Sequence, residues 1–218
     1  MPAFDGKVVL VTGGASGIGF ATCERLLQSG AAIIVWDKLE ADIENAVRRL
    51  DPSCERCRGF AVEVASASQV EAAFSESLKA FGDLHCAFNH AGIGVPTVPM
   101  ADISEAEFDK VMAVNLKGVW LSMKYELQHF RSRGGSIVNN ASVSGLVALS
   151  GQGAYTSAKH GVVGLTKTAA VEYAEAGVRV NAVCPGAIQT PILAHLEAAG
   201  IDEAALAGMS PAARVGAP

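Results

Sequence analysis

The strongest constraint on this fold is a regular alternation of short strand-like segments with longer helical ones. Strands are predicted for residues 7–12, 31–37, 58–64, 84–89, 135–140 and 178–184. Helices are predicted between them, over residues 17–29, 39–50, 67–81, 104–131 and 153–175. The first strand, "KVVLVT", is a continuous apolar run, as expected of a strand that is buried on both faces. Because parallel strands need crossover connections, we expect an α/β fold, a doubly wound parallel sheet with helices on both faces.

Composition agrees with one folded domain and excludes several classes of protein. Of the 218 residues, 50% are hydrophobic and 18% are charged, which allows a large core and argues against disorder. The chain has no repeat or linker, so we expect one domain over residues 1–218. The net charge of −5 argues against a nucleic-acid partner. No apolar run approaches the ~18–20 residues of a membrane span and no signal-peptide pattern opens the chain, so we expect no membrane partner and a cytoplasmic location.

The five cysteines do not form a recognisable metal or redox site. Cys54 and Cys57 form the pair "CERC", but a zinc site needs about four ligands and the sequence has no second such pair. The pair also lies between a predicted helix and a strand, whereas a redox pair would open a helix after a strand. We therefore expect no bound metal, and we expect Cys23, Cys86 and Cys184 to be small buried residues.

The loop after the first strand, "TGGASGIG", has the composition of a diphosphate-binding turn. Glycines let the backbone turn sharply and let a diphosphate approach, and the N-terminus of the next helix offers free N–H groups. The spacing differs from the G-x-G-x-x-G of many dinucleotide folds, and a glycine-rich turn without a ligand is the alternative. Because open parallel sheets bind ligands beyond the carboxyl ends of their strands, we expect a cofactor to contact Gly13, Ser16, Gly17, Ile18 and Gly19.

Asp37, at the end of the second predicted strand, indicates which cofactor binds. An acidic residue about 20 positions after such a loop accepts hydrogen bonds from the ribose hydroxyls of the adenosine, and Asp37 follows Gly19 by 18 residues. Its charge would repel the 2′-phosphate of NADP, so NAD is the expected cofactor and NADP the less favoured one. The alternative is that Asp37 caps the following helix, and the neighbouring Lys38 carries the opposite charge.

A phenol and an ammonium lie one helical turn apart in "AYTSAKHG". Tyrosine has a pKa of about 10, and a cation within about 4–6 Å lowers it, so we expect Lys159 to make Tyr155 a better acid–base group. Ser142 follows the fifth predicted strand and should face the same crevice, where its hydroxyl can bind a substrate oxygen. Asn115 lies on the apolar face of its helix, where a buried amide needs partners. It acts either in proton transfer or as a structural hydrogen-bonding group.

Six motifs, in order along the chain, resemble those of the short-chain dehydrogenase/reductase family. They are "TGGASGIG", "NHAG" (89–92), "NLKG" (115–118), "NNASVSG" (139–145), "YTSAK" (155–159) and "PGAIQT" (185–190). The resemblance implies a Rossmann fold and transfer of a hydride between a nicotinamide cofactor and a carbonyl or alcohol carbon. It implies that Tyr155 is the catalytic acid/base, Lys159 its helper and Ser142 the group that binds the substrate oxygen. Asn115 resembles the asparagine that supports a water-mediated proton relay.

The same resemblance extends the set of expected cofactor contacts. Around the adenosine it implies Asn89, Ala91 and Gly92, with Glu63 and Val64 in place of the family's frequent Asp-Val pair. Beside the nicotinamide it implies Tyr155, Lys159, Pro185, Gly186, Ile188 and Thr190. His90 stands where the family often has a second asparagine, and we expect this change to be tolerated because the loop backbone is the main contact.

The end of the chain departs from the family pattern. The family continues past a stretch like "SPAARVGAP" into a further helix and strand, about 25–30 residues. We therefore expect the final strand of the sheet to be missing and the strand at 178–184 to be an exposed edge. The resemblance implies tetramers built partly through that missing part. We expect a homodimer through the helices at 104–131 and 153–175 in place of the tetramer.

The expected activity is oxidation of an uncharged secondary alcohol by NAD, or the reverse reduction. The substrate walls should come from residues 93–99, 143–152 and 190–209, which contain no Arg or Lys, and residues 190–210 should form a lid. These segments supply Ile93, Val95, Leu146, Val147, Leu149, Ile192 and Leu193. One alternative is an NADPH-dependent 3-oxoacyl-thioester (acyl-carrier-protein) reductase, against which Asp37 argues. Another is a catalytically impaired dinucleotide-binding protein, which the missing end favours and the full Asn-Ser-Tyr-Lys set opposes.

Overall fold

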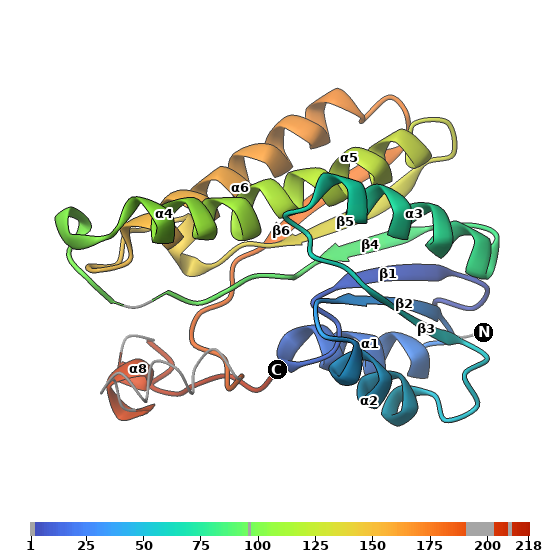
Figure 1. Cartoon of the computed structure of the whole chain (residues 1–218), viewed down its shortest axis with the longest axis horizontal. Coiled ribbons are helices and arrows are strands. Elements are labelled where there is room, and N and C mark those ends of the chain that lie inside the picture. Colours follow the sequence, from blue (N-terminus) through green and yellow to red (C-terminus); the bar gives the residue numbers. More distant parts are fainter. Residues whose placement is uncertain (1–2, 96, 191–202, 209–210) are drawn as a thin grey trace.

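The computed structural model describes residues 3–95, 97–190, 203–208 and 211–218, and within them the chain forms one parallel sheet of six strands (Figure 1). The strands are β1 (Val8–Thr12), β2 (Ala32–Asp37), β3 (Cys57–Ala61), β4 (Cys86–Asn89), β5 (Gly135–Asn140) and β6 (Val178–Val183). Their order is β3-β2-β1-β4-β5-β6, and every neighbouring pair is parallel. This confirms the predicted doubly wound sheet. The order reverses between β1 and β4, and open sheets bind their ligands at such a reversal.

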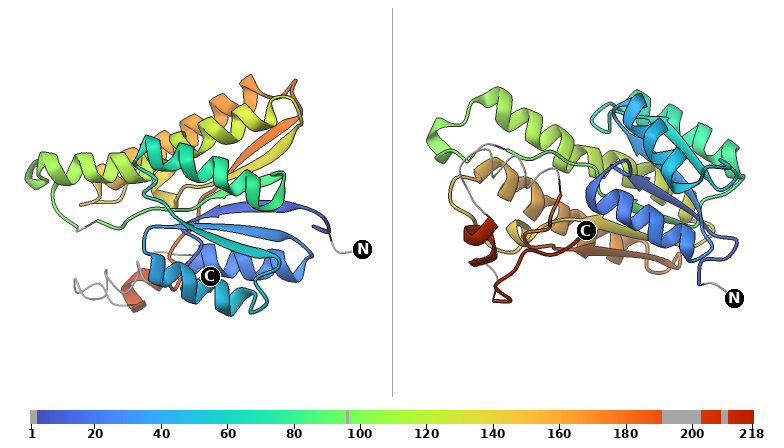
Figure 2. Two further views of the ribbon diagram at one scale, coloured as in Figure 1. Left: turned by 45° about the vertical axis from the view of Figure 1, so that its right-hand side comes forward. Right: turned by 90° about the horizontal axis from the view of Figure 1, so that it is seen from below.

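Helices cover both faces of the sheet. α1 (Gly17–Gln28) and α2 (Glu40–Leu50) lie on one face, and α3 (Ala67–Phe81), α5 (Gly118–Phe130) and α6 (Gly153–Glu172) lie on the other (Figures 1 and 2). The side chains of β1 alternate between two layers of core, because Leu10 packs with residues of α3 and α5 while Val11 packs with residues of α1. Both layers are apolar, which explains the unbroken apolar run in the sequence.

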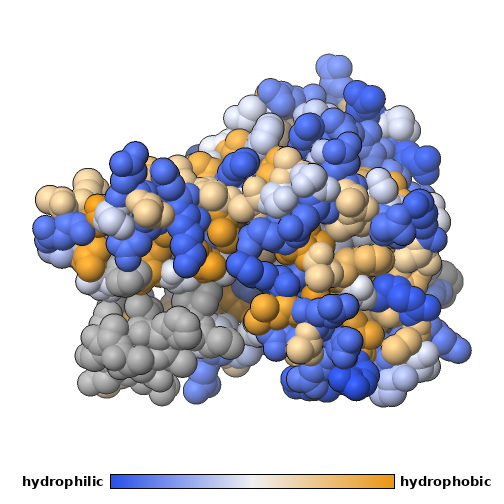
Figure 3. All heavy atoms as spheres, viewed as in Figure 1, coloured by the Kyte–Doolittle hydropathy of each residue, from blue (hydrophilic) through white to orange (hydrophobic). Residues whose placement is uncertain are grey.

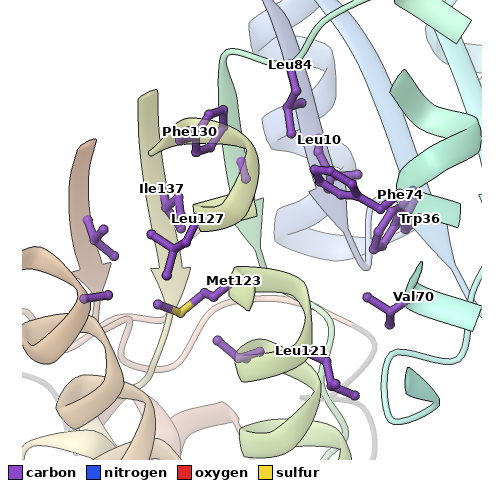
Figure 4. Close-up of a cluster of buried hydrophobic side chains, with 14 of the residues drawn as sticks. Leu10, Trp36, Val70, Phe74, Leu84, Leu121, Met123, Leu127, Phe130 and Ile137 are labelled. Carbon is purple, nitrogen blue, oxygen red and sulfur yellow. The ribbon is translucent and has the colours of Figure 1, made fainter. Parts of the chain in front are cut away.

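The larger core layer lies between the sheet and α3, α5 and α6. Trp36 and Phe130 are fully buried there, near Leu10, Phe74 and Ile137 (Figure 4). The Trp36 indole N–H donates to the Ser77 hydroxyl at 2.9 Å, so its one polar atom is satisfied. On the face shown in Figure 3, the outer surface of the helices is mainly hydrophilic, as expected of amphipathic helices packed on a sheet.

The helix predicted at 104–131 is interrupted in the middle. α4 (Glu105–Met112) begins with a capping box in which the Ser104 hydroxyl accepts the Glu107 N–H. A π-helical segment, Ala113–Lys117, then joins α4 to α5, and it contains the fully buried Asn115. Segments of this kind occur often at functional sites. Two short 3₁₀ turns, Met100–Asp102 and Val143–Gly145, are also absent from the sequence prediction.

In the part of the chain that the structure describes, β6 forms one edge of the sheet, as predicted. Beyond it, Ile188 forms a parallel bridge with Gly216, and the short α8 (Glu203–Gly208) lies between them in sequence. Most of the expected lid, including Ile192 and Leu193, lies outside the described residues. Among the described helices, none combines the length and the apolar character needed to cross a membrane.

The five cysteines are all free thiols. Cys23 is buried as predicted, whereas Cys86 and Cys184 are only half-buried, which corrects that part of the prediction. Cys57 is the first residue of β3 and is fully buried in the core, whereas Cys54 lies in the loop before that strand. Among the described residues, no group of three or more His, Cys, Asp or Glu side chains is placed to hold a metal ion.

Candidate active site

A crevice of about 1030 Å³ opens beyond the carboxyl ends of β1, β2, β4 and β5, where the strand order reverses. Most of the residues predicted from the sequence are in its wall: Gly13, Ser16, Gly17, Ile18, Asp37, Glu63, Val64, Ala91, Gly92, Ser142, Tyr155, Pro185, Gly186, Ile188 and Thr190. The other predicted residues are buried and stand behind that wall: Gly19, Asn89, Asn115 and Lys159. The fold therefore brings the whole predicted set to one place.

The glycine loop between β1 and α1 is packed too closely for larger side chains. A Cβ atom on Gly19 would collide with the Gly13 carbonyl oxygen, and one on Gly13 would lie 2.8 Å from Ala91 Cα. Gly13 also has a φ of 67°, which glycine adopts readily and other residues rarely do. Ser16 is the N-cap residue of α1 without a side-chain cap, so its hydroxyl and the first N–H groups of the helix can bind a ligand. This cradle fits a diphosphate, whose charge a helix N-terminus stabilises.

Asp37 ends β2 beside the glycine loop, and both of its oxygens accept backbone hydrogen bonds. The Oδ2 accepts the Ala15 N–H at 3.0 Å, and the Oδ1 accepts the Lys38 N–H at 2.8 Å. The first contact ties the end of β2 to the glycine loop. The N-cap residue of α2 is Leu39, which makes no side-chain cap, so the alternative in which Asp37 caps this helix is wrong.

The "NHAG" loop after β4 is anchored by side chains from β1 and β5. The Thr12 hydroxyl accepts the N–H groups of residues 90 and 91 at 3.0 and 3.1 Å. The His90 ring stacks on Phe88 with centroids 5.6 Å apart, and its Nδ1 accepts a hydrogen bond from the Asn140 Nδ2 at 2.9 Å. Burial lowers the pKa of His90 to about 4. The ring is therefore neutral near pH 7 and adds no charge to the site.

Asn115 uses its side chain to hold the segment after this loop. Its Oδ1 accepts the Ile93 N–H at 2.8 Å, and its Nδ2 donates to the Ile93 carbonyl at 2.9 Å. Both ends of the amide are therefore occupied by the backbone of one residue. This geometry favours the structural interpretation of Asn115 over direct proton transfer by its amide group.

Tyr155 and Ser142 meet at the wall of the crevice, and Lys159 lies behind them. Tyr155 comes from the first turn of α6, and Ser142 comes from the loop after β5, where it also accepts the Ser144 N–H at 3.1 Å. The Lys159 Nζ lies 5.6 Å from the centroid of the Tyr155 ring. It donates to the Asn140 carbonyl at 2.7 Å, which fixes the ammonium at the end of β5.

The pKa shift of Tyr155 differs from the one predicted from the sequence. Burial raises the pKa of Tyr155, and its hydrogen bond with Ser142 opposes the rise. Burial also lowers the pKa of Lys159 to about 8. Within the polypeptide alone, the expectation that Lys159 brings the pKa of Tyr155 below its ordinary value is wrong, because desolvation is the larger effect at this position.

Behind the crevice lies a buried polar network that the sequence prediction lacks. Glu126 of α5 is fully buried, and its Oε2 accepts the Asn89 Nδ2 at 2.9 Å. The Asn89 Nδ2 also donates to the Asn139 Oδ1 at 3.0 Å, and the Asn139 Nδ2 donates to the Thr166 hydroxyl at 2.9 Å. Burial raises the pKa of Glu126 to about 8. The network therefore joins β4, β5, α5 and α6 directly beneath the site.

Thr12 and Asn140 lie in two of the family motifs, but they are not among the site residues predicted from the sequence. Each is a polar residue at the last position of a strand, at the sheet edge where a ligand is expected, and that position is the signal that identifies them. Glu126 could have been identified as buried, because it lies about one helical turn from the apolar Met123 and Phe130 and so on the same helix face.

Comparison with known proteins gives a consistent result. Residues 7–200 match the family model described as short chain dehydrogenase. A 2,5-dichloro-2,5-cyclohexadiene-1,4-diol dehydrogenase of Sphingobium indicum is 43% identical over 195 residues, which cover 88% of this chain and 77% of that protein. A cyclohexanol dehydrogenase of Acinetobacter sp. strain SE19 is 39% identical over 217 residues, which cover 99% of this chain and 84% of that protein.

A solved structure agrees with these sequence matches. The crystal structure of levodione reductase has a TM-score of 0.91 to this chain at 38% identity, and the match covers 98% of this chain and 86% of that one. The family motifs found in the sequence surround one crevice at the reversal of strand order. The chain belongs to the short chain dehydrogenase family of oxidoreductases.

Proposed function

We propose that this protein is an NAD-dependent dehydrogenase that interconverts an uncharged secondary alcohol, in particular a cyclic one, and its ketone. The observation that carries the proposal is the meeting of Tyr155 and Ser142 at the wall of the crevice. The Lys159 ammonium, 5.6 Å from the tyrosine ring, supports the same assignment. Members of the family bind a nicotinamide dinucleotide, so the site is expected to hold one.

The residues around the glycine loop fit that cofactor. Gly13, Gly17 and the N-terminus of α1 would hold the diphosphate, and Asp37 would accept hydrogen bonds from the adenosine ribose. The segment 185–190 would lie beside the nicotinamide. When bound, the dinucleotide accepts a hydride from the alcohol or donates one to the ketone. Asp37 favours NAD, because a carboxylate beside the ribose repels the 2′-phosphate of NADP.

The side chains of the protein supply substrate binding and proton transfer. Ser142 donates a hydrogen bond to the substrate oxygen and holds it beside Tyr155. Tyr155 removes the hydroxyl proton during oxidation and returns it during reduction. Burial raises the pKa of Tyr155. A positive charge near a phenol favours the phenolate, and the Lys159 ammonium lies 5.6 Å from the ring centroid. Asn115 keeps the segment at Ile93 in place and so shapes the substrate side of the crevice.

An apolar wall supports an uncharged substrate. Ile93, Val95, Val147 and Leu149 line the crevice, and Lys110 of α4 reaches it as well. Leu146, also expected in the wall, is 61% exposed and is not among the described residues that line the crevice. Two relatives are named for acting on a cyclohexanol and on a cyclohexadiene diol, which supports a ring-shaped secondary alcohol as the substrate class.

Fluorescence titration with NADH and with NADPH, followed by assays of cyclohexanol and other alcohols, tests the proposal. We expect tighter binding of NADH and NAD-dependent oxidation of cyclic secondary alcohols. Tighter binding of NADPH, with reduction of a 3-oxoacyl thioester, would instead support the alternative reductase. Binding of a dinucleotide without turnover of any substrate would support the catalytically impaired alternative.

We also infer one domain over residues 1–218, a substrate lid at 190–210, and a homodimer formed through α4, α5 and α6. Phe108 of α4 and Trp120 of α5 support the dimer, because they are 38% and 46% exposed. Large apolar side chains on the surface of a helix are favourable contacts for a second chain.

A further inference from the structure

An ion pair lies next to Asp37 in the wall of the crevice. The Lys38 Nζ is 2.8 Å from the Glu63 Oε2, and both residues line the crevice together with Asp37. Lys38 follows β2 and Glu63 follows β3, so the pair connects the ends of two neighbouring strands. The proton transfer proposed for Tyr155 does not involve this pair.

Hydrogen bonds hold the backbone of both residues in place. The Lys38 N–H donates to the Asp37 Oδ1 at 2.8 Å, and the Glu63 N–H donates to the Gln69 Oε1 at 2.8 Å. The side chains are less constrained, since that of Lys38 is 70% exposed and that of Glu63 is 29% exposed. Exposed ion pairs contribute little to stability. The lysine can therefore change its partner without disturbing the fold.

Lys38 and Asp37 have opposite effects on a phosphate group in this part of the crevice. The Asp37 carboxylate repels the 2′-phosphate that distinguishes NADP from NAD, whereas an adjacent cation attracts it. The Glu63 carboxylate balances the positive charge of Lys38, because its Oε2 lies 2.8 Å from the Lys38 Nζ. The hydrogen bond between them raises the pKa of Lys38. The lysine therefore stays charged, but its charge is already paired.

We propose that Glu63 is a specificity-determining residue, which disfavours NADP by engaging the Lys38 ammonium that would otherwise offset the charge of Asp37. The inference rests on the proposed dinucleotide site. It adds that the preference for NAD depends on three charged residues at two strand ends and not on Asp37 alone. Loss of the Glu63 charge should free the lysine to bind a 2′-phosphate.

The test measures the dissociation constants of NADH and NADPH by fluorescence titration of the full chain. In Glu63→Gln, which keeps the size of the side chain and removes its charge, we expect the preference for NADH over NADPH to shrink about fivefold. Glu63→Ala should change the ratio in the same direction. In a Lys38→Ala background, Glu63→Gln should change the ratio less than about twofold, because no ammonium is released.

The outcomes separate this inference from the proposed function. An unchanged ratio in Glu63→Gln and Glu63→Ala, with NADH still bound, overturns the inference and leaves the proposed function standing. An equally large change in the Lys38→Ala background overturns it as well, because Glu63 would then act on the phosphate directly. If the wild-type protein binds neither dinucleotide, the proposed function fails and the inference fails with it.

Discussion

The pKa of Tyr155 depends on opposing effects of its surroundings. Burial raises its pKa, the Ser142 hydrogen bond opposes that rise, and Lys159 adds a positive charge behind the ring. The sequence predicts all three residues, because their spacing brings them to one end of the sheet. It does not predict the direction of the pKa shift, because desolvation depends on the surrounding packing. Likewise, the position of Asp37 is predictable but its contact with the Ala15 N–H is not.

Replacing Tyr155 by Phe removes the proposed proton-transfer group and keeps the ring. We expect turnover of a cyclic alcohol to fall by about 10²–10⁴, while NADH still binds. Steady-state assays and fluorescence titration measure the two quantities. Tyr173→Phe, just beyond the far end of α6, is the matched control and should keep its turnover. Full turnover in Tyr155→Phe would exclude the assignment.

Asp37 permits a similar comparison of two variants. Asp37→Asn removes the charge and keeps an oxygen that can accept the Ala15 N–H, so the preference for NADH over NADPH should shrink about fivefold. Asp37→Ala also loses the contact with the glycine loop and should weaken the binding of both dinucleotides. Titration of both variants measures these effects. The same NADH-to-NADPH ratio in the wild type and in both variants would refute the ribose role.

At the scale of elements, apolar runs and helical spacing predict the strands and helices well, and tertiary contacts explain the differences. The π-helical segment at 113–117 is not predictable, because it surrounds a contact between Asn115 and Ile93, which are 22 residues apart. β3 ends at Ala61, three residues before the predicted end, because the chain turns toward α3, where Gln69 accepts the Glu63 N–H.

The buried Glu126 network predicts a pH-dependent stability. The pKa of Glu126 is about 8 in the folded chain against an ordinary value of 4.5, so the folded state keeps a proton that the unfolded state releases. The contribution of Glu126 to the free energy of unfolding is at its maximum below about pH 4.5. It decreases as the pH rises toward 8, by up to about 1.4 kcal/mol per pH unit. Glu126→Gln mimics the neutral acid and should remove that decrease.

Urea unfolding of the wild type and of Glu126→Gln, between about pH 5 and pH 8, measures the effect. The free energy of unfolding should shift in favour of the variant as pH rises. His90 contributes the opposite slope between about 4 and 6.5, so the informative quantity is the difference between the two proteins. Glu172→Gln, at an exposed position of α6, is the control and should show no such trend. A pH-independent difference for Glu126→Gln would show that no proton is held there.

At the scale of the whole molecule, the alternation of strands and helices determines the parallel sheet, and the parallel sheet determines where the crevice opens. Both are therefore predictable from the sequence. The oligomeric state is harder to predict from the sequence, because an interface depends on which exposed side chains meet. β6 at the edge of the described sheet and the exposed Trp120 of α5 are the features that bear on it.

The proposed homodimer predicts a solution mass of two chains by light scattering. Trp120→Glu should shift that mass toward a single chain, because a charge would be buried at the interface. Leu39→Glu replaces a residue that is 58% exposed next to α2, on the other face of the sheet, and should leave the mass unchanged. A tetramer that resists high salt would contradict the proposal.

The close packing of Gly19 against Gly13 has a consequence for engineering this enzyme. Any side chain at Gly19 would collide with the Gly13 carbonyl oxygen, so every substitution there strains the loop. Lys38 and Glu63 are partly exposed, and their side chains can vary without that cost. A mutational library aimed at a new cofactor preference should therefore keep the glycine loop and Asp37 constant and randomise Lys38 and Glu63, whose side chains are not packed against the loop.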